Sequence, residues 1–217
     1  MKRLKAQAIL LDMDGTLVKS TSEIEKIWSY WCDRHQLSLQ QILSICHGVR
    51  SKDIISQVAP HLNAEAEVAS LNSLEIEHTS TGNAILGADK FIQTLLPHRW
   101  AVVTSCNKHV AVHRMQLSNL TLPELLIGSE DVVNGKPHPE PYQLAAFKLG
   151  VLPTDCIVFE DAIAGIQSAL SCGCRVVQVG GATALSDKVE AVIQNWNQVS
   201  LSSTAIPGEL EVVVNIR

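Results

Sequence analysis

Short runs of apolar residues recur along the chain, and each run ends at small or polar residues. The clearest runs lie at residues 8–11, 100–104, 125–127, 156–160 and 175–179, with a shorter one at 191–193. An apolar run of this length, followed by residues typical of a turn, predicts a strand buried on both faces of a sheet. The apolar tail at 209–216 follows a Pro-Gly pair and predicts one more strand, at an edge.

Between these runs, apolar residues recur every three or four positions, which predicts helices. Four of them, at 20–35, 37–45, 51–58 and 64–80, separate the first strand from the second. The later helices are predicted at 88–96, 108–117, 139–149, 164–171 and 187–190. Alternation of strand and helix predicts an α/β fold with a doubly wound parallel sheet. The long helical stretch exceeds what one crossover needs, so it indicates an inserted helical unit.

Charge and composition narrow the class of protein. The 217 residues include 17 Lys and Arg against 22 Asp and Glu, a formal net charge of −5 at pH 7. That balance argues against binding to nucleic acid or to anionic membranes, which requires a basic surface. The basic start of the chain is followed by only four apolar residues before Asp12, too few for a secretory or membrane segment. We therefore expect a cytoplasmic protein, and we take it to be a monomer.

Polar side chains stand at the ends of three predicted strands. Asp12 and Asp14 follow the first strand, Thr104 ends the second, and Glu160 and Asp161 end the strand that begins at 156. Open α/β sheets place their sites at the carboxyl ends of the strands. Carboxylates gathered there repel one another, and a divalent cation would offset that repulsion. Oxygen ligands of this kind suit Mg²⁺.

The stretch Asp12-Met13-Asp14-Gly15-Thr16 resembles the first signature motif of the haloacid dehalogenase superfamily, most of whose members are phosphatases. Thr104, Lys136 with Pro137, and Glu160-Asp161 resemble its second, third and fourth motifs, in the same order. The resemblance covers about residues 5–16 and 86–195. It implies a Rossmann-like core formed by residues 1–17 and 82–217, with residues 18–81 as a helical cap.

The resemblance also implies a mechanism of phosphoryl transfer. Asp12 would attack phosphorus and form an aspartyl phosphate, and Asp14 would act first as acid and then as base. Mg²⁺ would be held by the carboxylates of Asp12 and Asp161 and by the backbone carbonyl of Asp14. Glu160 would be a further ligand or the partner of one. Lys136 would offset the charge gathered by phosphate and nucleophile.

Other residues are expected to hold the substrate. The hydroxyl of Thr104 and the backbone N–H of Ser105 would bind phosphoryl oxygens, and Thr16 would orient Asp14. The loop 47–50, His-Gly-Val-Arg, lies between two predicted helices, and the resemblance places it over the site. The candidate substrate-binding residues are therefore Thr16, Ser105, His47, Gly48 and Arg50.

This loop and the Trp-bearing helix before it resemble those of bacterial sugar phosphatases and of yeast-type glycerol-phosphate and deoxyglucose-phosphate phosphatases. We therefore expect a Mg²⁺-dependent phosphatase that acts on a small phosphorylated metabolite, a sugar or polyol phosphate. Two alternatives stay open. One is a phosphosugar mutase of the β-phosphoglucomutase type, which shares every motif and returns the phosphoryl group to the sugar. The other is a non-catalytic binding protein of the same fold. Such a protein would be expected to lack some of the motif residues, and none is missing here.

Overall fold

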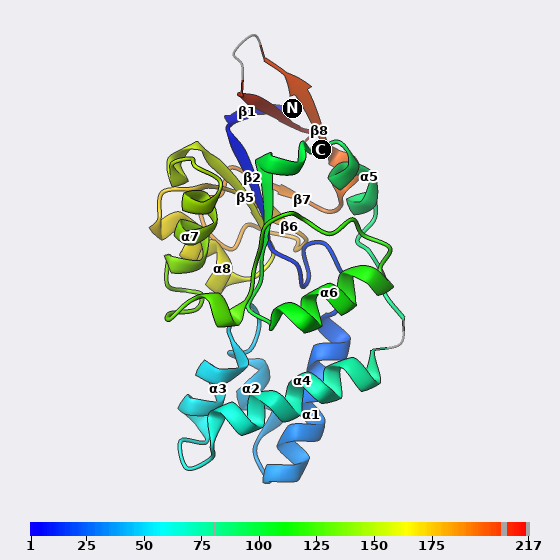
Figure 1. Ribbon diagram of the computed structural model, residues 1–217, viewed down its shortest axis with the longest axis vertical. Coiled ribbons are helices and arrows are strands. Elements are labelled where there is room, and N and C mark those ends of the chain that lie inside the picture. The colour runs from blue at the N-terminus through cyan, green and yellow to red at the C-terminus, as the bar shows by residue number, and fades with distance from the viewer. Residues whose placement is uncertain (80, 205–207, 216–217) are drawn as a thin grey trace.

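The strands predicted from the apolar runs form one six-stranded sheet in the computed structural model, which describes residues 1–79, 81–204 and 208–215. All neighbouring strands are parallel, in the order β4-β3-β2-β5-β6-β7 (Figure 1). Their bounds are β2 Ala8–Leu11, β3 Trp100–Val103, β4 Leu126–Ile127, β5 Cys156–Glu160, β6 Arg175–Val179 and β7 Ala191–Ile193. Because β2 and β5 pair at the centre, the acidic residues that follow them lie side by side.

Successive side chains of a strand point to opposite faces of the sheet, and each face has its own core. Ile9 and Leu11 pack on one side, whereas Ala8 and Leu10 pack on the other. The first side is covered by α5 Ala88–Gln93 and α6 Lys108–Leu117, the second by α7 Glu140–Lys148 and α8 Ile163–Ser171. Helices on both faces confirm the predicted doubly wound α/β fold.

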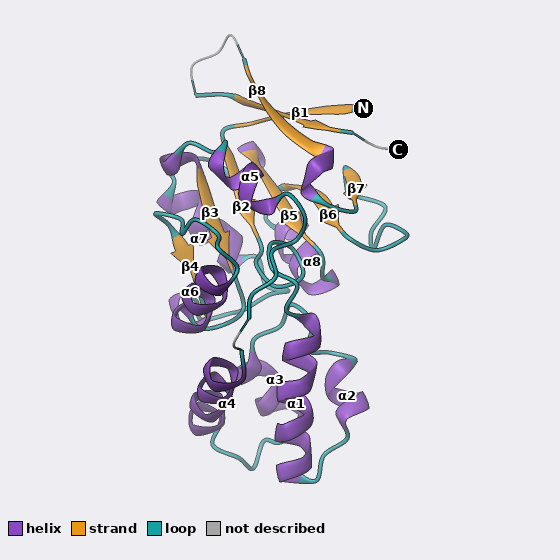
Figure 2. Cartoon of the chain, turned by 90° about the vertical axis from the view of Figure 1, so that its right-hand side faces the viewer, coloured by secondary structure: helices purple, strands orange, loops and turns teal. Residues whose placement is uncertain are grey.

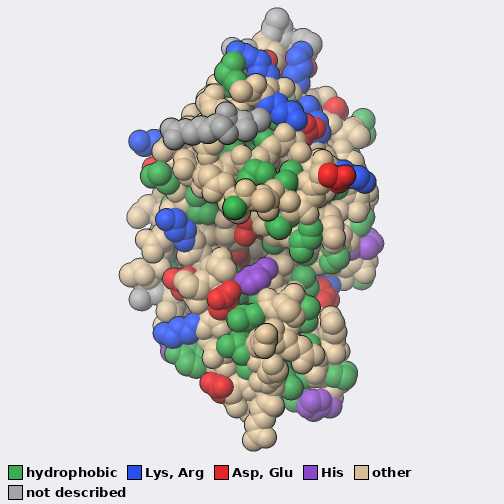
Figure 3. Space-filling view, turned by 180° about the vertical axis from the view of Figure 1, so that it is seen from behind, with side chains coloured by type: hydrophobic (Ala, Val, Ile, Leu, Met, Phe, Trp, Pro, Cys, Tyr) green, Lys and Arg blue, Asp and Glu red, His purple; other side chains and the backbone are tan. Residues whose placement is uncertain are grey.

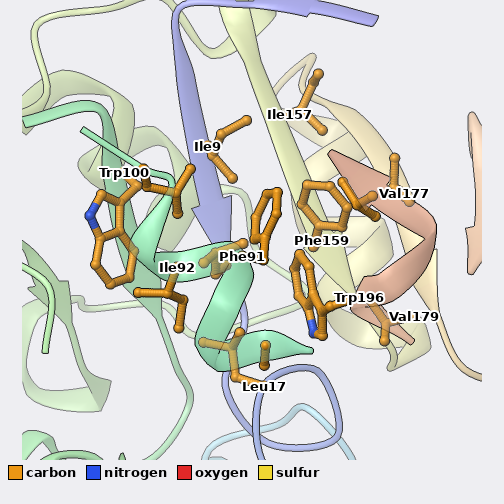
Figure 4. Close-up of a cluster of buried hydrophobic side chains, with 14 of the residues drawn as sticks. Ile9, Leu17, Phe91, Ile92, Trp100, Ile157, Phe159, Val177, Val179 and Trp196 are labelled. Atoms are coloured by element: carbon orange, nitrogen blue, oxygen red, sulfur yellow. The ribbon is translucent and has the colours of Figure 1, made fainter. Parts of the chain in front are cut away.

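An aromatic cluster fills the core on the α5 side of the sheet (Figure 4). Phe159 of β5 has its ring centroid 5.8 Å from that of Phe91 and 4.7 Å from that of Trp196. Phe91 and Trp196 stack on each other at 4.6 Å. Trp196 also donates a hydrogen bond from Nε1 to the carbonyl oxygen of Thr16 at 2.9 Å. The cluster thereby fixes the loop that carries Asp14.

Four helices form a separate lobe beyond the carboxyl ends of the strands (Figures 1 and 2). Their bounds are α1 Thr21–His35, α2 Leu39–Leu43, α3 Ser51–Val58 and α4 Ala64–His78. This helical lobe has its own apolar core, in which Trp28 and Trp31 pack edge to face with ring centroids 5.4 Å apart. Ser38 and Asn63 cap α2 and α4 by accepting hydrogen bonds from backbone N–H groups.

A second, antiparallel sheet lies at the opposite end of the molecule from the helical lobe (Figure 2). It consists of β1 Lys2–Ala6, β9 Leu210–Val214 and β8 Val199–Ser203, in that order. The prediction of an edge strand in the tail is therefore wrong, because β9 is paired on both sides. The ion pairs Arg3–Glu211 and Lys5–Glu209 cross this sheet. The strands β1 and β8 were not predicted, because polar residues interrupt their apolar positions, and β1 pairs with a strand at the other end of the chain.

The remaining differences are local. Residues 187–190 form turns rather than a helix, and β7 follows directly. Residues 80 and 216 of the predicted elements lie outside the described residues. Short 3-10 segments occupy Pro97–Arg99, Ser129–Asp131, Pro153–Asp155 and Trp196–Gln198. In the described ranges, no helix combines the length and the apolar character that crossing a membrane requires.

Candidate active site

A small cavity of about 60 Å³ lies between the sheet and the helical lobe. The sheet side of its wall includes Asp12, Asp14, Thr104 and Asp161, and the lobe contributes His47 among others. Seen from behind, a recess between the two parts of the molecule shows acidic side chains at its base (Figure 3). The polar residues predicted from three separate strand ends are thus brought to one place.

Lys136 is a buried cation of this site, with a side chain only 1% exposed. Its Nζ lies 2.7 Å from Oδ1 of Asp12 and 2.8 Å from Oε1 of Glu160, and it donates a third hydrogen bond to the carbonyl of Val103. Burial lowers the pKa of Lys136, but the two carboxylates outweigh it and hold the pKa above its usual value. The ammonium group therefore stays charged next to the nucleophile candidate.

Glu160 is fully buried, and both of its carboxylate oxygens have partners. Oε1 accepts hydrogen bonds from Lys136 and from the hydroxyl of Tyr142, and Oε2 accepts from the backbone N–H groups of Asp161 and Ala162. A Cβ on Gly165 would lie 1.5 Å from Oε1, so only glycine lets α8 pack over this carboxylate. These contacts favour Glu160 as the partner of the ligands, the second of the two roles expected from the sequence.

The carboxylates of Asp12, Glu160 and Asp161 each offer an oxygen within 4.8 Å of the others. The pKa of Asp12 is raised to about 7, mainly by burial and then by the charge of Glu160, while Lys136 opposes the rise. Burial, followed by Asp12 and Glu160, also raises the pKa of Asp161. Three carboxylates share one ammonium group here, so a divalent cation with a preference for oxygen ligands fits the excess negative charge.

The loop after β2 helps to position the carboxylate of Asp161. Gly15 has φ +83°, and a Cβ there would lie 1.9 Å from Oδ2 of Asp161. The hydroxyl of Thr16, a fully buried residue, donates to Oδ1 of Asp161 at 3.1 Å. The expectation that Thr16 orients Asp14 is therefore wrong: Thr16 holds Asp161 and does not line the cavity.

Asp14 is held by two residues that the sequence did not single out. Ser20 donates to its Oδ1 at 2.5 Å, and Nη1 of Arg114 donates to the same oxygen at 2.7 Å. Arg114 also reaches across to the helical lobe, where its Nη2 lies 2.7 Å from Oε2 of Glu75. A signal for Arg114 was present, because a charged residue stands in the apolar stripe that α6 presents to the sheet through Ala111 and other residues.

The loop after β3 and the lobe loop around Gly48 contact each other. The hydroxyl of Thr104 lies 3.2 Å from the backbone N of Cys106, which donates to it. Ser105 donates from Oγ to the carbonyl of Gly48 at 2.8 Å. Gly48 has φ +75°, and a Cβ there would lie 2.8 Å from the Cβ of Ala162. The lobe loop is thereby seated directly on the strand ends.

His47 and Arg50, the two candidates of that loop with long polar side chains, lie in different surroundings. His47 lines the cavity, is 42% exposed and lies 3.4 Å from a carboxylate oxygen of Glu25. Arg50 is buried, does not line the cavity, and pairs with Asp53 at 2.7 Å. Its other donors reach the carbonyls of residues 129, 132 and 133 on the core. The guanidinium of Arg50 is thus occupied by protein partners, but Arg50 also lines a larger neighbouring cleft, and its expected substrate contact stays a prediction.

Similarity to known proteins agrees with this arrangement. The family model for haloacid dehalogenase-like hydrolases matches residues 9–179. The chain is 34% identical to hexitol phosphatase A of Escherichia coli (strain K12) over 92% of this chain and 95% of that protein. It is 31% identical to glycerol-1-phosphate phosphohydrolase 2 of Saccharomyces cerevisiae over 81% of this chain and 75% of that protein.

Among solved structures, β-phosphoglucomutase from Clostridium difficile superposes with a TM-score of 0.75 over 89% of this chain and 92% of that one. At 20% identity, this likeness shows the fold alone. The family match covers most of the chain, including Asp12, Thr104, Lys136 and Asp161. From this match and these relatives, the protein is a member of the haloacid dehalogenase-like hydrolase family.

Proposed function

We propose that this hydrolase is a Mg²⁺-dependent phosphatase that releases phosphate from small sugar or polyol phosphates through an aspartyl phosphate on Asp12. The observation that carries the proposal is the pairing of two aspartates with different cations. Asp12 lies 2.7 Å from Lys136, and Asp14 lies 2.7 Å from Arg114, and both aspartates line one cavity. The similarity to hexitol and glycerol phosphate hydrolases supports the same reaction class.

In the first step, a carboxylate oxygen of Asp12 forms a bond to phosphorus while the bond to the leaving oxygen breaks. Asp14 gives that oxygen its proton, which an alkoxide leaving group requires. In the second step, Asp14 takes a proton from water, the water oxygen bonds to phosphorus, and the bond to Asp12 breaks. Lys136 and the Thr104 hydroxyl would offset charge on the transferring group.

The carboxylates of Asp12 and Asp161 would hold Mg²⁺ together with the backbone carbonyl of Asp14, and Glu160 would support them. When bound, the cation supplies positive charge next to the phosphoryl oxygens. Residues 18–81 would serve as the cap that covers this site, with Ser105, His47 and Gly48 near the substrate. The expectation of a cytoplasmic monomer stays a prediction.

Polyol substrates fit the surroundings of the cavity. A larger cleft of about 560 Å³ adjoins it between the helical lobe and the core, and the two share Glu75 and Ser105 in their walls. Its wall includes Asn72, Asn107 and Ser129, whose side chains donate and accept hydrogen bonds as sugar hydroxyls do. A phosphate group at Asp12 could thus be followed by a hydroxylated chain in the cleft.

The test is phosphate release from a panel of sugar and polyol phosphates, with Mg²⁺ and with excess chelator. The proposal expects inorganic phosphate to appear in step with substrate loss, and only with the metal. A mutase would instead yield an isomeric sugar phosphate and little free phosphate. Absence of turnover on the whole panel would favour the non-catalytic alternative.

A further inference from the structure

Arg114 is a buried cation that links the core to the helical lobe. It lies on α6 of the core, its side chain is 3% exposed, and it contacts two carboxylates at 2.7 Å each. One belongs to Asp14 in the loop after β2, and the other belongs to Glu75 on α4 of the lobe. All three residues line the cavity, so the chain of charges lies at the reaction site rather than behind it.

The hydrogen bonds to Asp14 are one-sided. Ser20 and Arg114 both donate to Oδ1, and in the described ranges Oδ2 has no donor. A carboxylate anchored through one oxygen from two directions cannot rotate freely, and its second oxygen remains available for a proton. Because proton transfer requires the acid within hydrogen-bond reach of the leaving oxygen, such anchoring matters directly to the first step.

Glu75 in turn fixes Arg114. Among the described residues, the only hydrogen-bond partner of the Glu75 side chain is this guanidinium, although the residue is buried on α4. The Nε of Arg114 has no hydrogen-bond partner in the described chain. A buried donor without a partner is costly, so this orientation of the guanidinium is set by its two carboxylate partners rather than by its own full set of hydrogen bonds.

We propose that Arg114 is a positioning residue that sets Asp14 for proton transfer, and that Glu75 of the helical lobe holds Arg114 in place. The inference rests on the proposed function, because it assumes that Asp14 is the acid and base. It goes further by making a lobe residue part of the apparatus that orients this group. A guanidinium suits the task, because its planar fork reaches two carboxylates at once, whereas an ammonium acts as a point charge.

The test compares leaving groups in Arg114→Gln, Arg114→Lys and Glu75→Gln. A polyol phosphate leaves as an alkoxide and needs the proton, whereas 4-nitrophenyl phosphate leaves with little help. General acid catalysis contributes about 10² to 10⁴-fold, so we expect Arg114→Gln to lower kcat on the polyol phosphate about 10 to 100-fold with a small change in KM. The single-turnover burst of nitrophenolate should fall much less. Glu75→Gln should show the same pattern, more weakly.

Controls separate positioning from other roles. Glu77→Gln changes an exposed residue on the same helix and should leave both substrates unaffected. Arg114→Lys keeps a charge that can reach one carboxylate and should recover part of the lost kcat. Equal losses on both substrates, or a rise in KM alone, would overturn the positioning role. If the Arg114 variants do not fold, Glu75→Gln still tests that role by the same comparison.

Asp14→Asn tells the two hypotheses apart. If Asp14→Asn shows no dependence on the leaving group, the acid and base role that the proposed function gives to Asp14 fails, and the positioning role fails with it. If Asp14→Asn shows that dependence while Arg114→Gln and Glu75→Gln do not, only the positioning role is refuted.

Discussion

Asp12 should make the metal-free protein less stable as pH rises, and Asp12→Asn should remove this effect. The carboxyl is 5% exposed, and burial together with Glu160 raises its pKa to about 7. The amide of asparagine keeps the shape and an oxygen that can accept from Lys136, but it carries no charge. The substitution therefore isolates the cost of ionising this one group.

The sign follows from the two pKa values of Asp12. Below about pH 3.8, the carboxyl is protonated in the folded state and mostly so in the unfolded state, so it costs little. Between about pH 4 and 7 the unfolded chain ionises while the folded protein keeps its proton, so stability falls as pH rises. The interval from 3.8 to about 7, at about 1.4 kcal/mol per pH unit, amounts to about 4 kcal/mol. Above about pH 7 the loss is complete.

The assay is urea unfolding of wild type and Asp12→Asn in excess chelator, from pH 4.5 to 8. The free energy of unfolding of Asp12→Asn minus that of wild type should increase as pH rises. Asp161 adds to this increase, because a neutral residue at position 12 removes one of the charges that raise the pKa of Asp161. Asp187→Asn, at an exposed position, should show no such trend. A difference between wild type and Asp12→Asn that does not change with pH would refute the reasoning.

The remaining predictions concern turnover and the intermediate. Excess chelator should abolish phosphate release, and full activity without metal would contradict the role of the acidic residues as metal ligands. Free Mg²⁺ at 100 times its Kd should stabilise wild type by about 2.7 kcal/mol in thermal unfolding, and Asp12→Asn by less. After mixing with an aryl phosphate, mass spectrometry should find a phosphoryl group on Asp14→Asn and none on Asp12→Asn; the reverse pattern would exchange the two roles. His47→Ala should change the relative kcat/KM values across a substrate panel. Arg50→Ala loses contacts to Asp53 and to the core, so it should lower the unfolding temperature. An Arg50→Ala protein of full stability would contradict a structural role for Arg50.

The residues at the strand ends were predictable because parallel strands impose a common direction. Asp12, Thr104 and Glu160 each follow an apolar run, and the carboxyl ends of parallel strands meet at one edge of the sheet. The sheet itself and its two helical layers follow from the same alternation of strand and helix. The common direction of the strands was enough to predict that these residues lie close together, and this prediction did not require knowledge of any side-chain contact.

Partners across the chain were not predictable in that way. Arg114 reaches Asp14 from a helix 100 residues later, and its place among apolar residues of α6 does not say which carboxylate it contacts. For Arg50 too, nothing in the sequence indicates that its guanidinium donates to the carbonyl oxygens of Val132 and Val133 on the core. The pairing of β1 with β9 likewise joins the two ends of the chain.

The division of labour between Asp12 and Asp14 is set by their neighbours rather than by their own chemistry. The two residues are alike and stand two positions apart, yet Asp12 faces a lysine and Asp14 faces an arginine. Lys136 offsets the negative charge that gathers where the carboxylate of Asp12 meets the phosphoryl group. The fork of Arg114 spreads over two carboxylates and fixes direction, which is what a proton donor needs. Exchanging the two cations, as in Lys136→Arg with Arg114→Lys, would therefore leave the net charge of the site unchanged and still impair both steps.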